Sequence, residues 1–443
     1  MKKPSIVASV LAAGLAGFMT TARAGDMNKN MAKLEFFKID AAAFDMGKVD
    51  YPGGKSMNLS AGIGSGAFHL KSDPDDIIYT VSDRGPNVDC KKAKKMTGWD
   101  HEKMCGGNKA SKIFPVPSFT PTIYKLRIAG DSLELLEKIT LKDSAGKAIT
   151  GLSNPLKGAK TEGAFGHDGK NLGFDPNGVD TEGLVKLSDG TFWLCDEYGP
   201  SILHVGADGR VIERLVPAGL EGDYAGATYP VRGTLPAILK KRKLNRGIES
   251  IAVSPDEKFL YFAMQSPLAH PDDKAYKKSA NVRIFKFDRL AKKTVGEWVY
   301  VMDKPDTFKA DNKKKKRKQS DVKVSEMVAV GMDRLIVLER INKVTKFYTI
   351  DLGQGTNIHA KQWDDPAAKP ALAQIKSDKL AEAGIIPVGK SLYFNTEGHK
   401  GVPEKIEGIA LMGQGKLMLI NDNDFGIAGD STQILRLTTQ KSW

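Results

Sequence analysis

The sequence predicts an all-β protein, a single β-propeller of six blades with long inserted loops, and five or seven blades are the alternatives. This prediction rests on a recurring motif in which a glutamate, an alternating apolar strand, a tight turn and a second strand follow one another. Turn formers are plentiful, with 45 Gly and 21 Pro, and helical periodicity is scarce. A pair of β-sandwich domains is the second architecture that these features allow.

Four copies of the motif occur along the chain, and they begin at Val179, Asn245, Val324 and Lys405. A weaker fifth copy begins at Ile63 and lacks the glutamate. Each of the four copies has a turn composition between two β-rich runs, which is typical of a hairpin. These turns span residues 188–190, 254–257, 331–333 and 413–415. The copies lie further apart than a minimal blade of roughly 40–50 residues, so loops must be inserted between them.

The N-terminus has the pattern of a secretory signal peptide. Two lysines precede an uncharged apolar stretch, and Ala22-Arg23-Ala24 matches a cleavage motif. We therefore expect cleavage after Ala24, with residues 1–24 removed and residues 25–443 forming one periplasmic or secreted domain. No later stretch predicts a membrane span.

The chain is basic, with 66 Lys+Arg against 53 Asp+Glu in 443 residues and a formal net charge of +13. Export separates the protein from the genome, so nucleic acid is not the expected partner. The excess of positive charge lies in residues 91–103, 240–246 and 309–318, and the rest of the mature chain is slightly acidic. These loops are expected to be solvated, and the expected partner of the monomer is a small anionic molecule.

Three cysteines are consistent with an oxidising compartment. Cys90 and Cys105 bracket a short polar loop that has few apolar residues of its own, so we predict a disulfide between them. Cys195 lies in an apolar run and is expected to be a buried small side chain.

Glutamates at the starts of the repeated strands predict a metal site. A hairpin returns the chain to its starting end, so residues that open the first strands and close the second strands should converge at one mouth of the propeller. Like charges at close range repel unless a cation lies among them. Oxygen ligands outside the cytoplasm favour Ca²⁺. The predicted ligands are Glu182, Glu249, Glu326, Glu407 and Asp422. The alternative is that they are solvated strand-end residues or ion-pair partners of arginines.

Three arginines recur at the same predicted end of the strands: Arg84, Arg246 and Arg340. A guanidinium group offers planar paired donors to phosphate or carboxylate, so these residues are predicted to bind substrate. Salt bridges between blades are the alternative role. Hydrolysis with a metal ion would also need a base, for which Asp83 and Glu197 are the candidates.

The segments DTEGLVKLSDGTFWLCDEYGPSILHVGADGRV, NRGIESIAVSPDEKFLYFAMQSPL and KIEGIALMGQGKLMLINDNDFGI occur in this order. Together they resemble the bacterial phytase-like family, also called "esterase-like activity of phytase", over roughly Ser60 to Thr439. The resemblance implies a secreted β-propeller with ester or phosphate-ester hydrolase activity and acidic residues at its mouth. The matching positions are Asp83, Glu182, Asp196, Glu197, Glu249, Glu407, Asp422 and Asp424. The sequence departs from the family pattern at residues 62–68 and at Met327.

The expected function is therefore metal-dependent hydrolysis of phosphate esters at the propeller mouth, with Ca²⁺ as the cofactor. A lactonase or carboxylesterase that uses the same metal is one alternative, and a propeller that binds a metal or an anion without turnover is another. The chain has no G-x-S-x-G, H-E-x-x-H or Walker motif, which argues against a serine hydrolase, a zincin or a nucleotide enzyme of familiar type.

Overall fold

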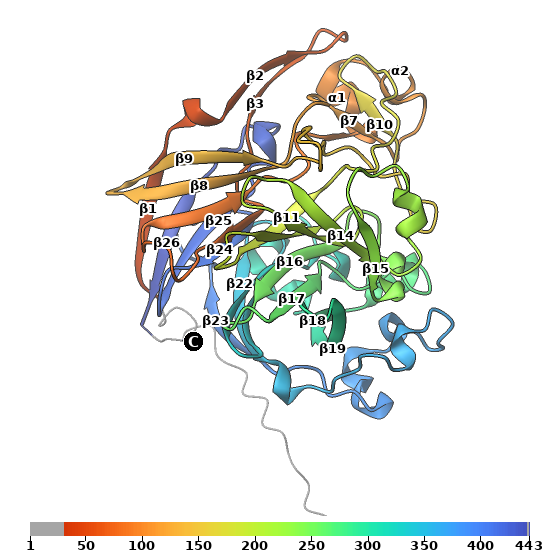
Figure 1. The fold of residues 1–443 in the computed structure, drawn as a ribbon, viewed down its shortest axis with the longest axis vertical. Helices are drawn as coiled ribbons and strands as arrows, with labels where there is room; N and C mark the ends of the chain where they lie inside the picture. The colour runs from red at the N-terminus through yellow and green to blue at the C-terminus, as the bar shows by residue number, and fades with distance from the viewer. Residues whose placement is uncertain (1–30, 441–442) are drawn as a thin grey trace, which may run out of the picture.

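The computed structural model describes residues 31–440 and residue 443, so the predicted signal peptide lies outside the described residues. Strands dominate the described chain, and the helices are short and lie in connections (Figure 1). The all-β prediction is confirmed. Within the described residues, no helix is long and apolar enough to cross a membrane.

Most strands belong to five mainly antiparallel units. The first contains β4 (Gly66–Phe68), β5 (Ile77–Val81), β8 (Thr122–Ala129) and β9 (Ser132–Thr140). The second contains β11 (Thr181–Lys186), β12 (Phe192–Asp196), β13 (Ser201–Val205), β14 (Val211–Pro217) and β15 (Val231–Leu235), the last parallel to β14. The third contains β16 (Ile248–Val253), β17 (Phe259–Met264), β18 (Asn281–Asp288) and β19 (Lys293–Val301).

The remaining two units complete the set. The fourth contains β20 (Lys323–Gly331), β21 (Arg334–Arg340), β22 (Thr345–Asp351) and β23 (Lys390–Asn395). The fifth contains β24 (Ile406–Leu411), β25 (Lys416–Asn421), β26 (Ile434–Thr439) and β1 (Met31–Ile39). All four predicted turns fall at the junction of the first and second strands of a unit, so the hairpins predicted from turn chemistry are present.

The first strands of the five units form a closed ring. β4 contacts β11, β11 contacts β16, β16 contacts β20, β20 contacts β24, and β24 contacts β4 again. The approach is close, because a Cβ atom added at Gly66 would lie 2.7 Å from the Cα atom of Gly183. This radial arrangement is propeller-like, and it differs from the pair of β-sandwich domains that the sequence also allowed.

The two ends of the chain close this ring. β1 pairs with β26 in antiparallel register, and its last two residues pair in parallel with β9. The first and fifth units thereby form one eight-stranded sheet. Because the first strand of the chain completes the last unit, hydrogen bonds between distant segments hold the ring together.

An insertion after β5 builds a small lobe. It contains β6 (Val88–Asp89), α1 (Ala93–Thr97), α2 (His101–Cys105) and β7 (Lys112–Phe114), and β10 (Ala164–Gly166) pairs in parallel with β7. Figure 1 shows these elements together at one end of the molecule. The lobe encloses the Cys90–Cys105 disulfide, which confirms the predicted pairing. Cys195 is free and buried, as expected.

Other connections carry the remaining elements. The hairpin of β2 (Asp45–Asp50) and β3 (Ser56–Ser60) contributes Tyr51, Met57 and Leu59 to the apolar cluster of the lobe. Helices α3 (Asp273–Lys278) and α4 (Lys309–Asn312) lie within and after the third unit. The longest connection inside the fourth unit, residues 352–389, contains only short 3₁₀ helices. Residues 313–316 of the basic run are exposed, as expected for a solvated loop. The same expectation is wrong for residues 240–246, because Arg242 is buried and donates to Tyr198 O and Lys160 O.

Replacing Cys90 and Cys105 together by serine should destabilise the lobe. The disulfide closes a loop with a sequence separation of 15, and a loop of this size is stabilised by up to about 3 kcal/mol. We expect faster proteolysis at the lysines of residues 91–103 in the double variant, measured under native conditions. Wild-type protein in reductant should behave like the variant, and an unchanged cleavage rate in both would contradict the expectation.

Candidate metal centre

A β-bulge lies near the start of the first strand in four of the five units. Its extra residue is Glu182 in β11, Glu249 in β16 and Glu407 in β24, because the flanking residues pair with consecutive residues of the second strand. A bulge re-aims the side chain of its extra residue. These three predicted glutamates therefore occupy equivalent positions at one end of the ring.

Glu326, the fourth predicted glutamate, is displaced by one residue from this position. In β20 the pairing skips Ser325, and Glu326 pairs with Leu338. Its place in the strand corresponds to Gly183 and Gly408 in other units. The repeat alignment read from the sequence is thus corrected by one residue, and Ser325 is the equivalent of the three bulge glutamates.

The side chain of Glu326 reaches across the axis of the ring. A Cβ atom added at Gly66 would lie 3.3 Å from its Oε2 atom, although β4 and β20 are not neighbours in the ring. Its Oε1 atom accepts a hydrogen bond of 2.9 Å from the backbone N–H of Met327. Burial raises the pKa of Glu326 well above its ordinary value, and its Oε2 atom is buried without a hydrogen-bond partner.

Two groups of three carboxylate side chains lie at this end of the ring, and Glu182 belongs to both. Asp83 and Asp180 complete the first group, and Glu197 and Glu249 complete the second. Within each group the ligand oxygens lie within 4.8 Å of one another. These five side chains, which we call the carboxylate cluster, come from the ends of β5 and β12 and from the starts of β11 and β16.

Burial perturbs the carboxylate cluster strongly. It raises the pKa of Asp180 to about 7 and that of Glu249 to about 8, and the neighbouring Glu197 contributes to both shifts. The pKa values of Asp83 and Glu182 are raised well above ordinary values by burial and by neighbouring carboxylates. Burial is the largest cause of all four shifts, and repulsion between neighbouring carboxylates adds to it.

Three oxygens of the carboxylate cluster are buried without a hydrogen-bond partner: Asp180 Oδ2, Glu197 Oε1 and Glu249 Oε2. The nearest guanidinium nitrogens lie 3.6 Å from Asp180 Oδ2 and 3.8 Å from Glu197 Oε1. A buried acceptor without a donor is costly, and a divalent cation would satisfy several such oxygens together. The donor set therefore fits a hard cation such as Ca²⁺.

Arg84 is buried and its side chain is used within the protein. It donates to Glu162 and Ser153 at 3.1 Å each, and it pairs with Asp180 at 3.6 Å. Its guanidinium group also lies 4.5 Å from the ring centre of Tyr198. These contacts join Arg84, which follows β5, to residues 153–162 and to Asp180 at the start of the second unit, and this is the salt-bridging role that the sequence left open.

Arg340 and Glu407 form a buried ion pair between the fourth and fifth units. Arg340 also donates to Ser325 Oγ at 3.0 Å, so the serine at the bulge position binds the arginine in place of a carboxylate. Glu407 is separate from the carboxylate cluster and already has a cationic partner.

Arg246 and Lys323 form a positive sector beside the carboxylate cluster. Arg246 hydrogen-bonds to Gln265 and lies 3.8 Å from Glu197, and 24% of its side chain is exposed. Burial and the neighbouring Arg246 and Arg340 lower the pKa of Lys323 to about 7. The mouth thus combines a region rich in acids with a cationic edge.

Asp422 occupies the same place in its hairpin as Glu197 does in its own, because each follows the second strand. Burial and Asp424 raise the pKa of Asp422 to about 7. It lines a cavity of about 240 Å³ together with Lys405, and Lys405 pairs with Asp424. Asp196, a further family position, is buried in an ion pair with Arg214.

The sequence analysis missed Asp180 and Lys323. Each of them lies two residues before the bulge position of its unit, beside the end of the second strand. Glu197 N–H donates to Asp180 O at 3.0 Å, and Lys323 pairs with Arg340. Asp180 lies within the first copy of the motif, which begins at Val179, but the equivalent positions of the other copies hold Gly247, Lys323 and Lys405, so the repeat gave no signal for an acid there.

Comparison with known proteins identifies relatives of the chain. The family model of Phytase-like, described as "Esterase-like activity of phytase", matches residues 65–425. A protein of Arthroderma benhamiae, described as an uncharacterized secreted protein, is 27% identical over 195 residues. That match spans 38% of this chain and 38% of the relative.

Two solved structures are distantly similar to the chain. The PQQ-bound aldose sugar dehydrogenase of Streptomyces coelicolor is 11% identical with a TM-score of 0.31, over 93% of this chain and 100% of that one. The calcium-binding protein regucalcin of Agrobacterium tumefaciens is 10% identical with a TM-score of 0.33, over 87% and 96% of the two chains. TM-scores this low carry no argument about fold or function.

Metal-free protein should lose stability as the pH rises from 5 to 7. Carboxyl groups with raised pKa values stabilise the folded state below their ordinary pKa, and this contribution is lost as the pH rises toward the folded value, which is about 8 for Glu249. The free energy of unfolding of the Glu249→Gln variant should fall less steeply with pH than that of the wild type, by up to about 1.4 kcal/mol per pH unit. Denaturant unfolding in chelator at both pH values measures this difference, and equal slopes would refute the charge argument.

Proposed function

The chain belongs to the Phytase-like family, described as esterase-like activity of phytase, and we propose that it hydrolyses phosphate esters with a bound divalent cation. The observation that supports this proposal is the carboxylate cluster, whose two groups of three share Glu182 and contain buried oxygens without hydrogen-bond donors. The adjoining cations Arg246 and Lys323 suit an anionic substrate.

Glu182, Glu197 and Glu249 would hold the cation. Asp83 and Asp180 form the adjoining group, which also contains Glu182. Ca²⁺ takes six to eight oxygen ligands, so the group leaves positions for water and for substrate oxygens. When bound, the cation supplies positive charge that polarises a phosphoryl oxygen. Glu197, which the sequence suggested as a base, is assigned here to cation binding because its Oε1 atom is buried without a donor.

Asp83 is the base in this proposal. It is the one member of the carboxylate cluster that is only partly buried, so a substrate can approach it. Its Oδ1 atom accepts a hydrogen bond of 2.8 Å from the backbone of Gly85, which holds the side chain in place. A cation among the neighbouring acids would favour the ionised form of Asp83, and its carboxylate could then accept a proton from attacking water and return it to the leaving group.

The cationic edge orients the substrate. Arg246 is partly exposed and next to Glu197, so its guanidinium group can contact a phosphate held over the carboxylate cluster. The charges of Arg246 and Arg340 act on Lys323, and its amine becomes a third positive charge when it binds a proton. Arg84, Arg340, Glu326 and Glu407 are not included in the proposed site, because their contacts lie within the fold.

The cellular setting and the architecture complete the proposal. The Cys90–Cys105 disulfide fits an oxidising compartment, in line with the predicted export signal and the secreted relative. We also infer that the five units are the whole complement of blades, in place of the six favoured by the sequence, because their first strands close the ring. The substrate is a small anion, and the protein works as a monomer.

Glu182→Gln and Glu249→Gln should each lower phosphate-ester turnover by at least about 100-fold, because each removes a charge from the site that stabilises the reaction. Glu326→Gln is the matched control: it is the same substitution on a buried first-strand glutamate outside the carboxylate cluster, and it should retain activity. Turnover of phosphate monoesters and diesters, with circular dichroism as the folding check, measures this. Full activity in both cluster variants would disprove the proposal.

Chelation should abolish the same activity, and added Ca²⁺ should restore it. Lactones and carboxylic esters are assayed in parallel, because the same metal centre could serve them. Chelator-sensitive turnover of lactones alone would favour the lactonase alternative. Tight Ca²⁺ retention without turnover of any ester would favour a binding protein.

A further inference from the structure

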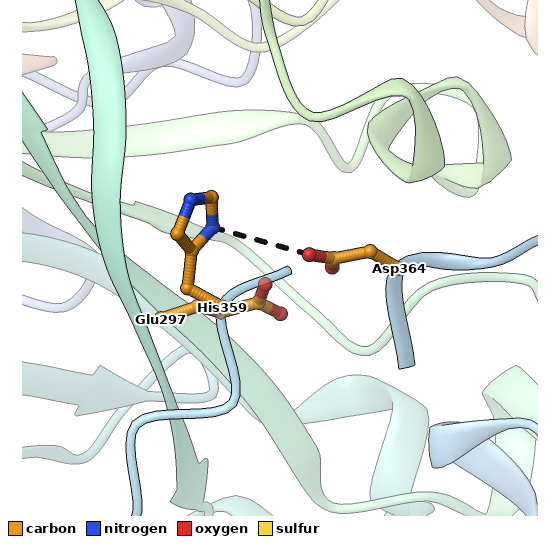
Figure 2. A group of neighbouring side chains, drawn as sticks. All are labelled: Glu297, His359 and Asp364. Atoms are coloured by element: carbon orange, nitrogen blue, oxygen red, sulfur yellow. Dashed lines mark ion pairs between the residues drawn. The ribbon is translucent and has the colours of Figure 1, made fainter. Parts of the chain in front are cut away.

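A second group of potential metal ligands lies away from the mouth, at the outer edge of the third unit. Glu297 belongs to β19, the outermost strand of that unit, and His359 and Asp364 belong to residues 352–389 of the fourth unit. Figure 2 shows the His359 ring directed toward Asp364, with the carboxyl group of Glu297 beside them. Segments from two units therefore converge on one point.

The three side chains present their ligand atoms at short range. One nitrogen and two carboxylate oxygens all lie within 4.8 Å of one another, and His359 Nδ1 is 4.0 Å from Asp364 Oδ2. Glu297 is fully buried with 0% exposure, and its Oε2 atom has no hydrogen-bond partner. The Nδ1 atom of His359 is also buried and without a hydrogen-bond partner. The group thus contains two buried polar atoms, Glu297 Oε2 and His359 Nδ1, that have no hydrogen-bond partner.

Arg283 forms ion pairs with one oxygen of each carboxylate in the group, Glu297 Oε1 and Asp364 Oδ1. Its Nη1 atom contacts Glu297 Oε1 and lies 3.1 Å from Asp364 Oδ1, and its Nη2 atom donates to Trp363 O at 2.6 Å. This guanidinium group contacts each carboxylate through one oxygen; Glu297 Oε2 is left without a hydrogen-bond partner, and Asp364 Oδ2, which accepts from Ala360 N–H, keeps a second lone pair for a ligand. Outer groups that orient ligands in this way are usual around protein metal sites.

The backbone also positions the group. Ile358 N–H donates to Glu297 O at 2.8 Å, and Ala360 N–H donates to Asp364 Oδ2 at 3.0 Å. Ile358 and Trp363 are buried in an apolar cluster with Val299 of β19. These contacts anchor the segment without using the His359 ring, so the ring is free to serve a ligand.

We propose that Glu297, His359 and Asp364 bind a zinc ion that fastens residues 352–389 to the third unit. Zn²⁺ accepts nitrogen and oxygen ligands in tetrahedral sites, whereas Ca²⁺ and Mg²⁺ favour all-oxygen sets. A tetrahedral ion with bonds of about 2.1 Å places its ligands roughly 3.4 Å apart. The ligand atoms, which lie within 4.8 Å of one another, need to approach by up to about 1.4 Å, with water as the fourth ligand. This site is independent of the proposed hydrolase.

Burial raises the pKa of Glu297 well above its ordinary value, and Arg283 opposes that shift. A zinc ion would favour the ionised carboxylate and satisfy its free oxygen together with the imidazole nitrogen. The two carboxylates, Arg283 and Zn²⁺ would then sum to a single positive charge at a partly exposed site.

Zinc binding to the metal-free mature protein, measured by titration calorimetry and elemental analysis in excess Ca²⁺, tests the proposal. Wild-type protein should bind zinc at this site, and His359→Gln should weaken that binding by at least about 100-fold, beyond the loss typical of outer-group changes. His101→Gln is the matched control, because His101 also lies beside a carboxylate, Glu102, at 3.1 Å, but belongs to no group of three potential ligands among the described residues. Equal zinc binding in wild type and His359→Gln overturns the proposal.

Two further measurements separate this site from the mouth. Glu249→Gln should leave the zinc site intact, and loss of zinc in that variant but not in His359→Gln would place the ion elsewhere and overturn the proposal. Zinc should also slow proteolysis at the exposed Lys361 and Lys376 in wild type and not in His359→Gln. Equal cleavage with and without zinc in the wild type would overturn the fastening role.

Discussion

Pairing between the two ends of the chain is the constraint on which the rest of the structure depends. β1 hydrogen-bonds to β26 and touches β9, so the first and last units become one sheet and the ring of first strands closes. Only a closed ring brings residues from β4, β11, β16, β20 and β24 to one axis. The close approach of Gly66 to Gly183 shows how tightly this axis is packed. The composition of the mouth follows from this geometry.

Closure concentrates charge, and the protein balances it unevenly around the ring. Between the fourth and fifth units Arg340 neutralises Glu407, and in the lobe Arg84 serves Glu162 and Asp180. Around Glu182 the compensation is incomplete, and the buried carboxylates have raised pKa values. Folded proteins seldom retain buried carboxylates without a partner. A bound cation would therefore fit this cluster better than a purely structural network of salt bridges.

Particular residues show how far sequence reasoning reached into the site. Glu182 and Glu249 were identified from the repeat alone, because a glutamate opening a hairpin strand must lie near the residues that close it. Glu326 was misaligned by one residue, since Ser-Glu in this copy replaces the Glu-Gly or Glu-Ser of the others and strand register depends on hydrogen bonding. Arg84 could not be assigned from its position in sequence, because its partners Glu162 and Ser153 come from a distant insertion.

By itself the sequence determined the all-β class, the hairpins, the Cys90–Cys105 disulfide and the family, because turn chemistry, alternation and ordered motifs are local properties of the chain. The tertiary structure decided how many units enclose the axis, which acids share a site, and which arginines are used internally. It also brought His359 to Glu297, although 62 positions separate them in the chain. These outcomes depend on contacts between units, and such contacts are set by strand register and ring closure, which no local pattern encodes.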